Sequence, residues 1–453
     1  MRHETKHYQI LVIVLIIILL PGCSTIQQYP LKNERQKLKV LYFDEKEFFN
    51  DFGMLYSALN PEIDFEIVTI EEEQGSSSID IDFDFQKIID KIQPDILFLS
   101  LDQYQKLSHD GKLTEISSMI KQDKYDISNL APGTIDLLKS KEGELFGLSP
   151  FYYSKVLFYN IDLFEKYRVT FPVDKMSWED LLEKSVCFTD TISSKDRIYG
   201  FYAGGDLYQL GNAIGSSYGL DVVDLTGMKM AINTPNWEYI YAIALEAQKT
   251  GAFYSPDLDG SKSWESYESF YLNDPFLSGR MAMTIAGPEM LEQLKRAKIV
   301  LKENFKWDIV TVPTNPNNPD YTNTTSINQV FSIYNNSTNK KEAWKFIKYI
   351  HSNEFARITS KSPQTGKLHI RSSYLKDVEG HNLSAYYTLK PLQNDFQNLT
   401  NTPIGFSSQF EQMASEKLRM VLYENVPIKS ALDDLQQEAQ QLLDSAYQDV
   451  INE

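Results

Sequence analysis

The first regular pattern of apolar and polar positions begins at Leu38. Residues 38–43 predict a strand, residues 47–59 have the apolar spacing of an amphipathic helix, and residues 63–70 predict a second strand. A strand, a helix and a further strand in this order are typical of a βαβ unit. The pattern therefore predicts an α/β fold from its first elements.

A third strand is predicted over residues 94–100, where PDILFLS is apolar enough to be buried on both faces. Asp102 and Tyr104 follow it, on either side of Gln103. Ligands of open α/β sheets bind outside the carboxyl ends of the strands, which makes both residues candidates for ligand binding. An aspartate just before a helix can equally serve as its cap, and both roles for Asp102 stay open.

Between these strands, the alternation of acidic and apolar residues over 79–85 predicts an extended segment with three carboxylates on one face. A calcium loop would need a glycine and a later glutamate where this sequence has Phe85 and Lys91. We therefore expect a solvated acidic face, no metal site and no cofactor.

Aromatic residues and turn formers concentrate in residues 143–164, GELFGLSPFYYSKVLFYNIDLF. The pattern predicts a hairpin or crossover beside a cleft, with a strand over 156–159. Tyr152 and Tyr153 come just after Pro150 and are candidate ligand contacts.

The N-terminus has the features of an export signal. Arg2 and Lys6 precede an apolar run at 10–20, and Leu-Pro-Gly-Cys at 20–23 resembles a bacterial lipobox. We expect a signal peptide at 1–22, lipidation of Cys23 and a polar tether at 23–37. The mature protein would be anchored by lipid to the extracytoplasmic face of the cell membrane. An uncleaved short membrane anchor is the alternative.

Composition narrows the class of protein. A chain of 453 residues favours two packed lobes, and 42% hydrophobic residues exclude wholesale disorder. A formal charge of -18 argues against a nucleic-acid surface. Cys23 and Cys187 are the two cysteines of the sequence, so lipidation of the first would leave no intramolecular disulfide and no cysteine zinc cluster.

Several segments together resemble the extracellular solute-binding proteins of ABC importers, in the family 1, maltose-binding-like class. They are PDILFLSLDQYQKLSHDGKLTEIS from Pro94, YNIDLF at 159–164, SWEDL at 177–181, FLSGRMAMTIAGP at 276–288 and NKKEAWKFIKYIHSNE at 339–354. The resemblance implies an α/β, two-lobed periplasmic-binding-protein-like fold with crossing strands at a hinge. It also implies a monomer without catalytic residues, which captures a small solute, expected to be a carbohydrate, and delivers it to ABC permease subunits.

By the same resemblance, residues 38–149 and 330–380 form lobe one, and residues 150–329 and 381–453 form lobe two. Asp206 and Tyr208 match a stretch of the family that supplies an acid and aromatic rings to the ligand. Glu289 stands after Gly287 and Pro288, where sugar binders of this family usually have a tryptophan. Phe410 matches the region of another aromatic contact.

Two other classes of function remain open. The pattern Gly-x-Ser-x-Gly at 215–219 is that of a hydrolase nucleophile elbow, but residues 208–214 do not predict the strand that must precede it. We interpret it as a glycine-rich loop. An anchored hydrolase acting on carbohydrates, or a solute sensor that partners a membrane kinase, are the alternatives to transport.

Overall fold

The computed structural model describes residues 35–69, 81–188, 197–202, 205–254, 266–302, 305–360, 366–374, 380–381, 383–392, 402–403 and 405–452. The chain divides into two compact units, Met1–Ser77 and Ser78–Glu453, which we describe separately. The predicted signal peptide, Cys23 and most of the tether lie outside the described residues.

The first unit is the predicted βαβ unit. Strand β1 (Gln36–Tyr42) pairs in parallel with β2 (Ile63–Thr69), and the crossover consists of α2 (Glu45–Phe48), a π-helical turn η1 (Phe49–Gly53) and α3 (Met54–Leu59). The rings of Phe48 and Phe65 meet edge to face with centroids 5.0 Å apart, so the crossover packs directly on β2.

The second unit contains two larger groups of strands. In one, β11 (Val330–Ile333) runs antiparallel to both β3 (Ile96–Leu99) and β4 (Gly147–Leu148). Helices of this part are α5 (Ile81–Ile92), α6 (Leu101–His109), α7 (Ser117–Asp123), α8 (Thr134–Leu138), α15 (Lys340–Ile350) and α16 (Asn353–Thr359).

The other group is a four-stranded sheet in the order β7-β8-β6-β9. Its strands are β6 (Val156–Asn160), β7 (Tyr199–Tyr202), β8 (Met281–Ala286) and β9 (Trp307–Thr311). Nearby helices are α9 (Ile161–Tyr167), α10 (Trp178–Val186), α13 (Tyr267–Asn273), α14 (Glu289–Leu301) and α17 (Ala385–Thr388). Short ladders join β5 (Phe151–Tyr152) to β12 (Leu368–His369) and β10 (Tyr321–Thr322) to β13 (Lys390–Pro391).

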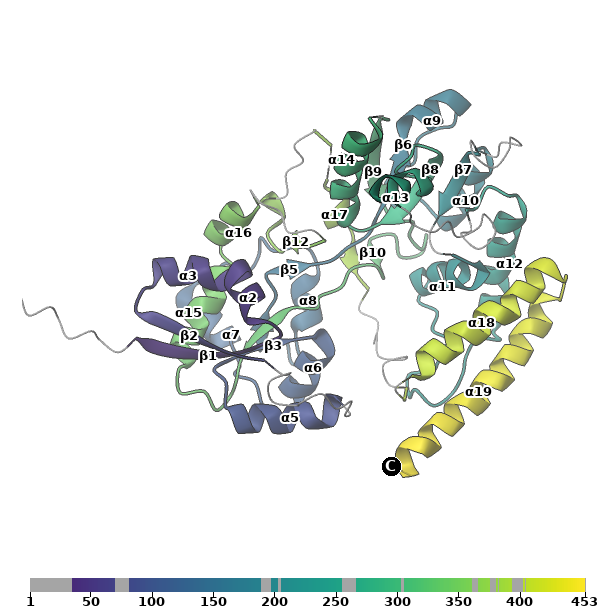
Figure 1. Cartoon of the computed structure of the whole chain (residues 1–453). Helices are drawn as coiled ribbons and strands as arrows, with labels where there is room; N and C mark the ends of the chain where they lie inside the picture. The colour runs from purple at the N-terminus through teal and green to yellow at the C-terminus, as the bar shows by residue number, and fades with distance from the viewer. Residues whose placement is uncertain are drawn as a thin grey trace, which may run out of the picture. The chain divides into compact units, whose positions relative to one another are not determined.

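Four helices pack together in the second unit. Helix α11 (Leu207–Ser217) packs against α12 (Pro235–Lys249) and α18 (Phe406–Tyr423), and α18 lies alongside the long α19 (Ile428–Asn452) (Figure 1). One apolar core joins these helices to α9, α10 and the sheet, with Trp237, Tyr241, Phe410 and Leu435 among its fully buried members. Leu432, Leu435 and Ala439 are buried on α19 as their helical spacing predicts.

The acidic segment was predicted wrongly. Residues from Ile81 onward form α5, not an extended segment. Buried Phe85, Ile88, Ile89 and Ile92 recur at intervals of three and four, which is the period of a helix. The alternation over 79–85 was too short a window to reveal that period.

Among the described residues, no helix combines the length and the apolar character needed to cross a bilayer. The apolar run at 10–20 is outside them.

Candidate functional site

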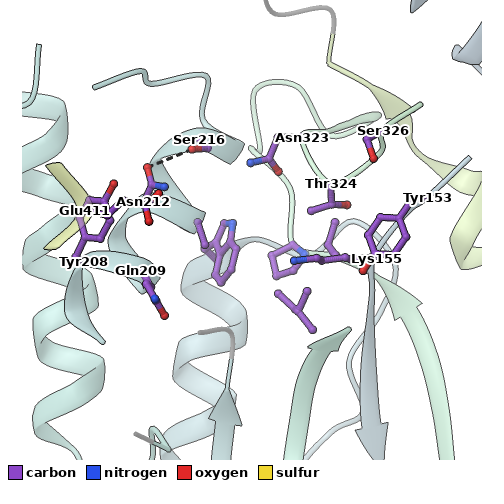
Figure 2. Close-up of a pocket in the computed structure, with 15 residues that line it drawn as sticks. Tyr153, Lys155, Tyr208, Gln209, Asn212, Ser216, Asn323, Thr324, Ser326 and Glu411 are labelled. Atoms are coloured by element: carbon purple, nitrogen blue, oxygen red, sulfur yellow. Dashed lines mark hydrogen bonds between the residues drawn. The ribbon is translucent and has the colours of Figure 1, made fainter. Parts of the chain in front are cut away.

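A cavity of about 530 Å³ lies in the second unit. Its walls come from α10, α11 and α18, from the segment after β5, and from the loops that follow β9 and β10 (Figure 2). This volume is within the range of sites that hold small molecules, roughly 300 to 1,000 Å³.

One face of α11 forms a polar wall of the cavity. The carboxylate of Asp206 caps this helix by accepting a hydrogen bond from the Gln209 N–H at 2.8 Å. Tyr208, Asn212 and Ser216 recur every four residues and therefore share a face, and all three line the cavity. A hydrogen bond of 3.5 Å joins the side chains of Asn212 and Ser216 (Figure 2).

The neighbouring face of α11 is held close to α12 by glycines. A Cβ on Gly211 would lie 2.2 Å from the Tyr241 ring, and one on Gly215 would lie 2.2 Å from the Trp237 ring. The glycine-rich loop expected around Gly215 is therefore a wrong interpretation, because this residue is inside a helix. Ser217 is on the same helix, without the strand-to-helix turn of a nucleophile elbow.

Trp178, the first residue of α10, contributes a small exposed part of its ring to the cavity. Its ring lines the cavity although only 3% of the residue is exposed. The indole N–H donates to Ser217 Oγ at 2.7 Å, so the polar edge of the ring is satisfied by α11. An aromatic surface with its polar edge already bonded offers an apolar face to a ligand.

Opposite α11, the backbone fixes a second polar wall. Tyr153 and Ser326 exchange two backbone hydrogen bonds, of 3.0 and 2.9 Å. This bridge places the Tyr153 ring beside Asn323, Thr324 and Ser326, which all line the cavity. The exposed side chain of Lys155 also lines it.

Tyr208 is the most buried polar group of the wall. Its hydroxyl has no hydrogen-bond partner among the described residues, and its ring meets Phe410 edge to face at 5.9 Å. Burial, followed by the negative charges of Glu411 and Asp206, raises the pKa of Tyr208 well above its usual range. The phenol therefore stays protonated at neutral pH.

The structure brings several of the predicted site residues together. Tyr153 and Tyr208 line the cavity, and Phe410 lies beneath Tyr208. Glu289 contacts the Tyr153 hydroxyl, and Asp206 caps the helix that carries Tyr208. Ligand binding by these five residues stays a prediction.

Three further predicted residues, Asp102, Tyr104 and Tyr152, are not among those that line the cavity. Asp102 is exposed in the first turn of α6, and the cap of this helix is Ser100, so the alternative role of Asp102 as a cap is wrong. Tyr104 is buried, donates to the Leu138 carbonyl at 2.6 Å and accepts from the Phe146 N–H. Tyr152 is buried and donates to the Tyr386 carbonyl at 3.1 Å. Their roles in binding, and the lipidation of Cys23, remain predictions.

Most of the polar wall was not predicted from the sequence. The overlooked lining residues include Trp178, Gln209, Asn212, Ser216, Asn323, Thr324, Ser326 and Glu411. The spacing of Tyr208, Asn212 and Ser216 was a usable signal, because polar residues every four positions predict one polar helix face. No comparable periodicity marks the loop residues, which reach the site through the bridge between Tyr153 and Ser326.

The cavity suits a ligand that is rich in hydroxyl groups. Its neutral hydroxyl and amide side chains can both donate and accept hydrogen bonds. Rings of Trp178, Tyr153 and Tyr208 supply apolar surface between them. The mixed α/β architecture and this cavity are compatible with the class of small-molecule binding proteins.

Comparison with known proteins agrees with this class. Residues 40–356 match the family model described as bacterial extracellular solute-binding protein. The chain belongs to this family. A binding protein of Brucella abortus is 24% identical over 234 residues, which are 50% of this chain and 50% of that protein. The chain thus spans about half the length of the curated relatives it matches.

Solved structures share the fold along almost the whole chain. A sugar transporter of Rhizobium etli in an open conformation has a TM-score of 0.64 and 20% identity, and the match covers 89% of this chain and 99% of that one. The sugar-binding protein MalE from Xanthomonas citri has a TM-score of 0.64 and 14% identity, with coverage of 92% and 100%. These similarities confirm the predicted α/β, two-lobed periplasmic-binding-protein-like fold.

Proposed function

We propose that this protein is the lipid-anchored sugar-binding component of an ABC importer. It captures a small carbohydrate between two lobes at the cell surface and delivers it to the permease subunits. The family match supports extracellular solute binding, and two neighbours in fold are named as a sugar transporter and a sugar-binding protein.

The observation that carries the sugar assignment is the pairing of neutral hydrogen-bonding groups with aromatic rings around one cavity. The C–H faces of a sugar ring pack on an aromatic ring, and sugar hydroxyls exchange hydrogen bonds with amides and hydroxyls. Asn212, Ser216 and Asn323 provide such groups, beside the ring of Trp178.

Binding without chemistry is the better fit to this cavity. Most glycoside hydrolases act with two carboxylates that flank the scissile bond. Among the described residues that line the cavity, Glu411 carries the single carboxylate. Release to a permease also favours many moderate contacts over a covalent intermediate.

Calorimetric titration of the purified protein with neutral mono- and disaccharides tests the proposal, with chromatography of each sugar afterwards. We expect saturable heat with at least one sugar and full recovery of that sugar. Cleaved sugar would establish a hydrolase instead, and no heat with any sugar would refute the carbohydrate assignment. Asn212→Ala should weaken binding, because Asn212 lines the cavity. Asn335→Ala is the matched control and should leave binding unchanged, because Asn335 is not a lining residue.

The lipid anchor has its own test. Mass spectrometry of the protein from its native membrane should find an N-terminal residue 23 with acyl groups attached. Cys23→Ser should release the protein from the membrane fraction while sugar affinity stays unchanged. A mature chain that begins at Met1 with an unmodified cysteine would exclude the anchor.

A further inference from the structure

Gly287, Glu289 and Tyr153 form a compact group at the edge of the cavity. Glu289 Oε1 accepts hydrogen bonds from the Gly287 N–H at 3.1 Å and from the Tyr153 hydroxyl at 3.4 Å. A Cβ on Gly287 would lie 2.2 Å from the Tyr153 oxygen and 2.4 Å from Glu289 Oε2. The Tyr153 hydroxyl thus occupies the space that a side chain at position 287 would need.

The carboxylate of Glu289 has no ion-pair partner among the described residues. It stands at the first position of α14, a helix of 13 residues, where the helix dipole favours a negative charge. Glu289 is not itself one of the residues that line the cavity, whereas Tyr153 is. Glu289 is therefore connected to the cavity through the Tyr153 hydroxyl, and any effect of Glu289 on a ligand would pass through the Tyr153 side chain.

The two phenols nearest to this carboxylate are both neutral, and of these Tyr153 donates a hydrogen bond to it. Burial, followed by the charge of Glu289, raises the pKa of Tyr153 to about 12. Burial and the same charge also raise the pKa of the buried Tyr386 well above its usual range. Both phenols keep their protons at neutral pH, so the contact between Tyr153 and Glu289 is a hydrogen bond from a neutral donor to a charged acceptor.

We propose that Glu289 is a positioning residue, which holds the Tyr153 ring in the orientation that forms the cavity wall and does not itself contact the solute. Gly287 leaves the space that this orientation needs. The backbone bridge to Ser326 fixes the main chain of Tyr153, and Glu289 fixes the far end of its side chain. This inference rests on the proposed function in one respect, which is that the solute is taken to be a sugar.

The first experiment needs no solute. Nitration of tyrosines by tetranitromethane, followed by peptide mass spectrometry, reports the accessibility of Tyr153 in the intact protein. Glu289→Ala should increase nitration of Tyr153 several-fold, because the hydroxyl loses its acceptor. Glu289→Gln removes the same charge but keeps an acceptor oxygen, so its nitration should stay below that of Glu289→Ala. Equal nitration in all three proteins would overturn the positioning role, whether or not the solute is a sugar.

The second experiment is a double-mutant cycle on sugar affinity. Glu289→Ala should weaken binding about tenfold, which corresponds to losing one hydrogen bond to a charged group. In a Tyr153→Phe background, the same change should have less than a twofold effect. Equal losses in both backgrounds would show that Glu289 contacts the solute directly.

Gly287→Ala provides an independent variant that keeps the carboxylate. Its Cβ should displace the Tyr153 hydroxyl and reproduce both the nitration and the affinity change of Glu289→Ala. Unchanged nitration and affinity in a folded Gly287→Ala protein would contradict the proposal. Absence of sugar binding by the unmodified protein would refute the sugar assignment alone, because nitration still decides the role of Glu289.

Discussion

The indole N–H of Trp178 donates to the hydroxyl oxygen of Ser217 at 2.7 Å, and the same hydroxyl donates to the Ile214 carbonyl at 2.7 Å. Ser217 thus joins the start of α10 to the end of α11. The two helices contribute the aromatic face and the polar face of the cavity, so this hydroxyl fixes one wall against the other.

Ser217→Ala should therefore reduce both stability and solute affinity. The buried indole N–H would lose its acceptor, which costs about 1 to 3 kcal/mol. Urea unfolding followed by fluorescence measures the first effect, and calorimetric titration measures the second.

The neighbouring serine offers a matched control. Ser216 lines the cavity, and its side chain bonds to Asn212 on the same helix. Ser216→Ala should change the free energy of unfolding by less than about 0.5 kcal/mol, as is usual for partly exposed positions, while it weakens binding. The prediction fails if the two variants unfold alike.

Gly215→Ala tests the close packing of α11 on α12. An added methyl group would overlap the Trp237 ring, so one helix must move away from the other. Overpacking of this kind costs about 1 to 3 kcal/mol, which exceeds the helix propensity gained by replacing glycine with alanine. Chemical unfolding should show a net loss of stability, and a stabilised protein would contradict the packing described here.

The strands and long helices could be predicted because their signals are local. Residues 38–43 and 63–70 each have the length and apolar content of a strand, and β1 (Gln36–Tyr42) and β2 (Ile63–Thr69) lie there. The stripe that contains Leu432, Leu435 and Ala439 has the helical period over many turns, and it forms α19. The prediction failed at α5 because the seven residues 79–85 alternate like a strand, whereas the helical period is visible only over the 12 residues of the helix.

The site was harder to predict because its walls are assembled by contacts between distant segments. Tyr153 meets Ser326 only through a backbone bridge, and Trp178 meets Ser217 only through the packing of two helices. Such contacts leave no periodic signal in the chain. Resemblance to a family indicated Tyr208. The Gly-x-Ser-x-Gly pattern at 215–219 suggested a loop, because the close packing of Gly215 on Trp237 was not visible in the sequence.

Asp206 provides a prediction about the helix that carries the polar wall. Asp206→Ala should lower the free energy of unfolding by about 1 kcal/mol, because the Gln209 N–H loses its capping acceptor. Asp206→Ser should restore most of that loss, since serine is also a good N-cap. Thermal unfolding of the two variants makes the comparison, and equal melting temperatures would show that the cap contributes nothing.

Stability should fall as the pH falls below neutrality because of buried histidine. Burial lowers the pKa of His351 from 6.5 to about 4, and one ring nitrogen lies 2.6 Å from the Ile347 carbonyl. Between these two pKa values the unfolded chain binds a proton that the folded protein does not bind. Unfolding therefore becomes more favourable as pH falls from about 6.5 to about 4.

The full shift of His351 corresponds to roughly 3 kcal/mol at a pH below both values. His351→Gln removes the titrating group, so its free energy of unfolding should depend less steeply on pH across this window, even if the variant is less stable at pH 7. Burial also lowers the pKa of His369 to about 4, so His369→Gln should flatten the same window. Urea titrations at several pH values between 7 and 4 measure these slopes. Parallel curves for His351→Gln and the unmodified protein would show that the buried imidazole does not cause the acid sensitivity.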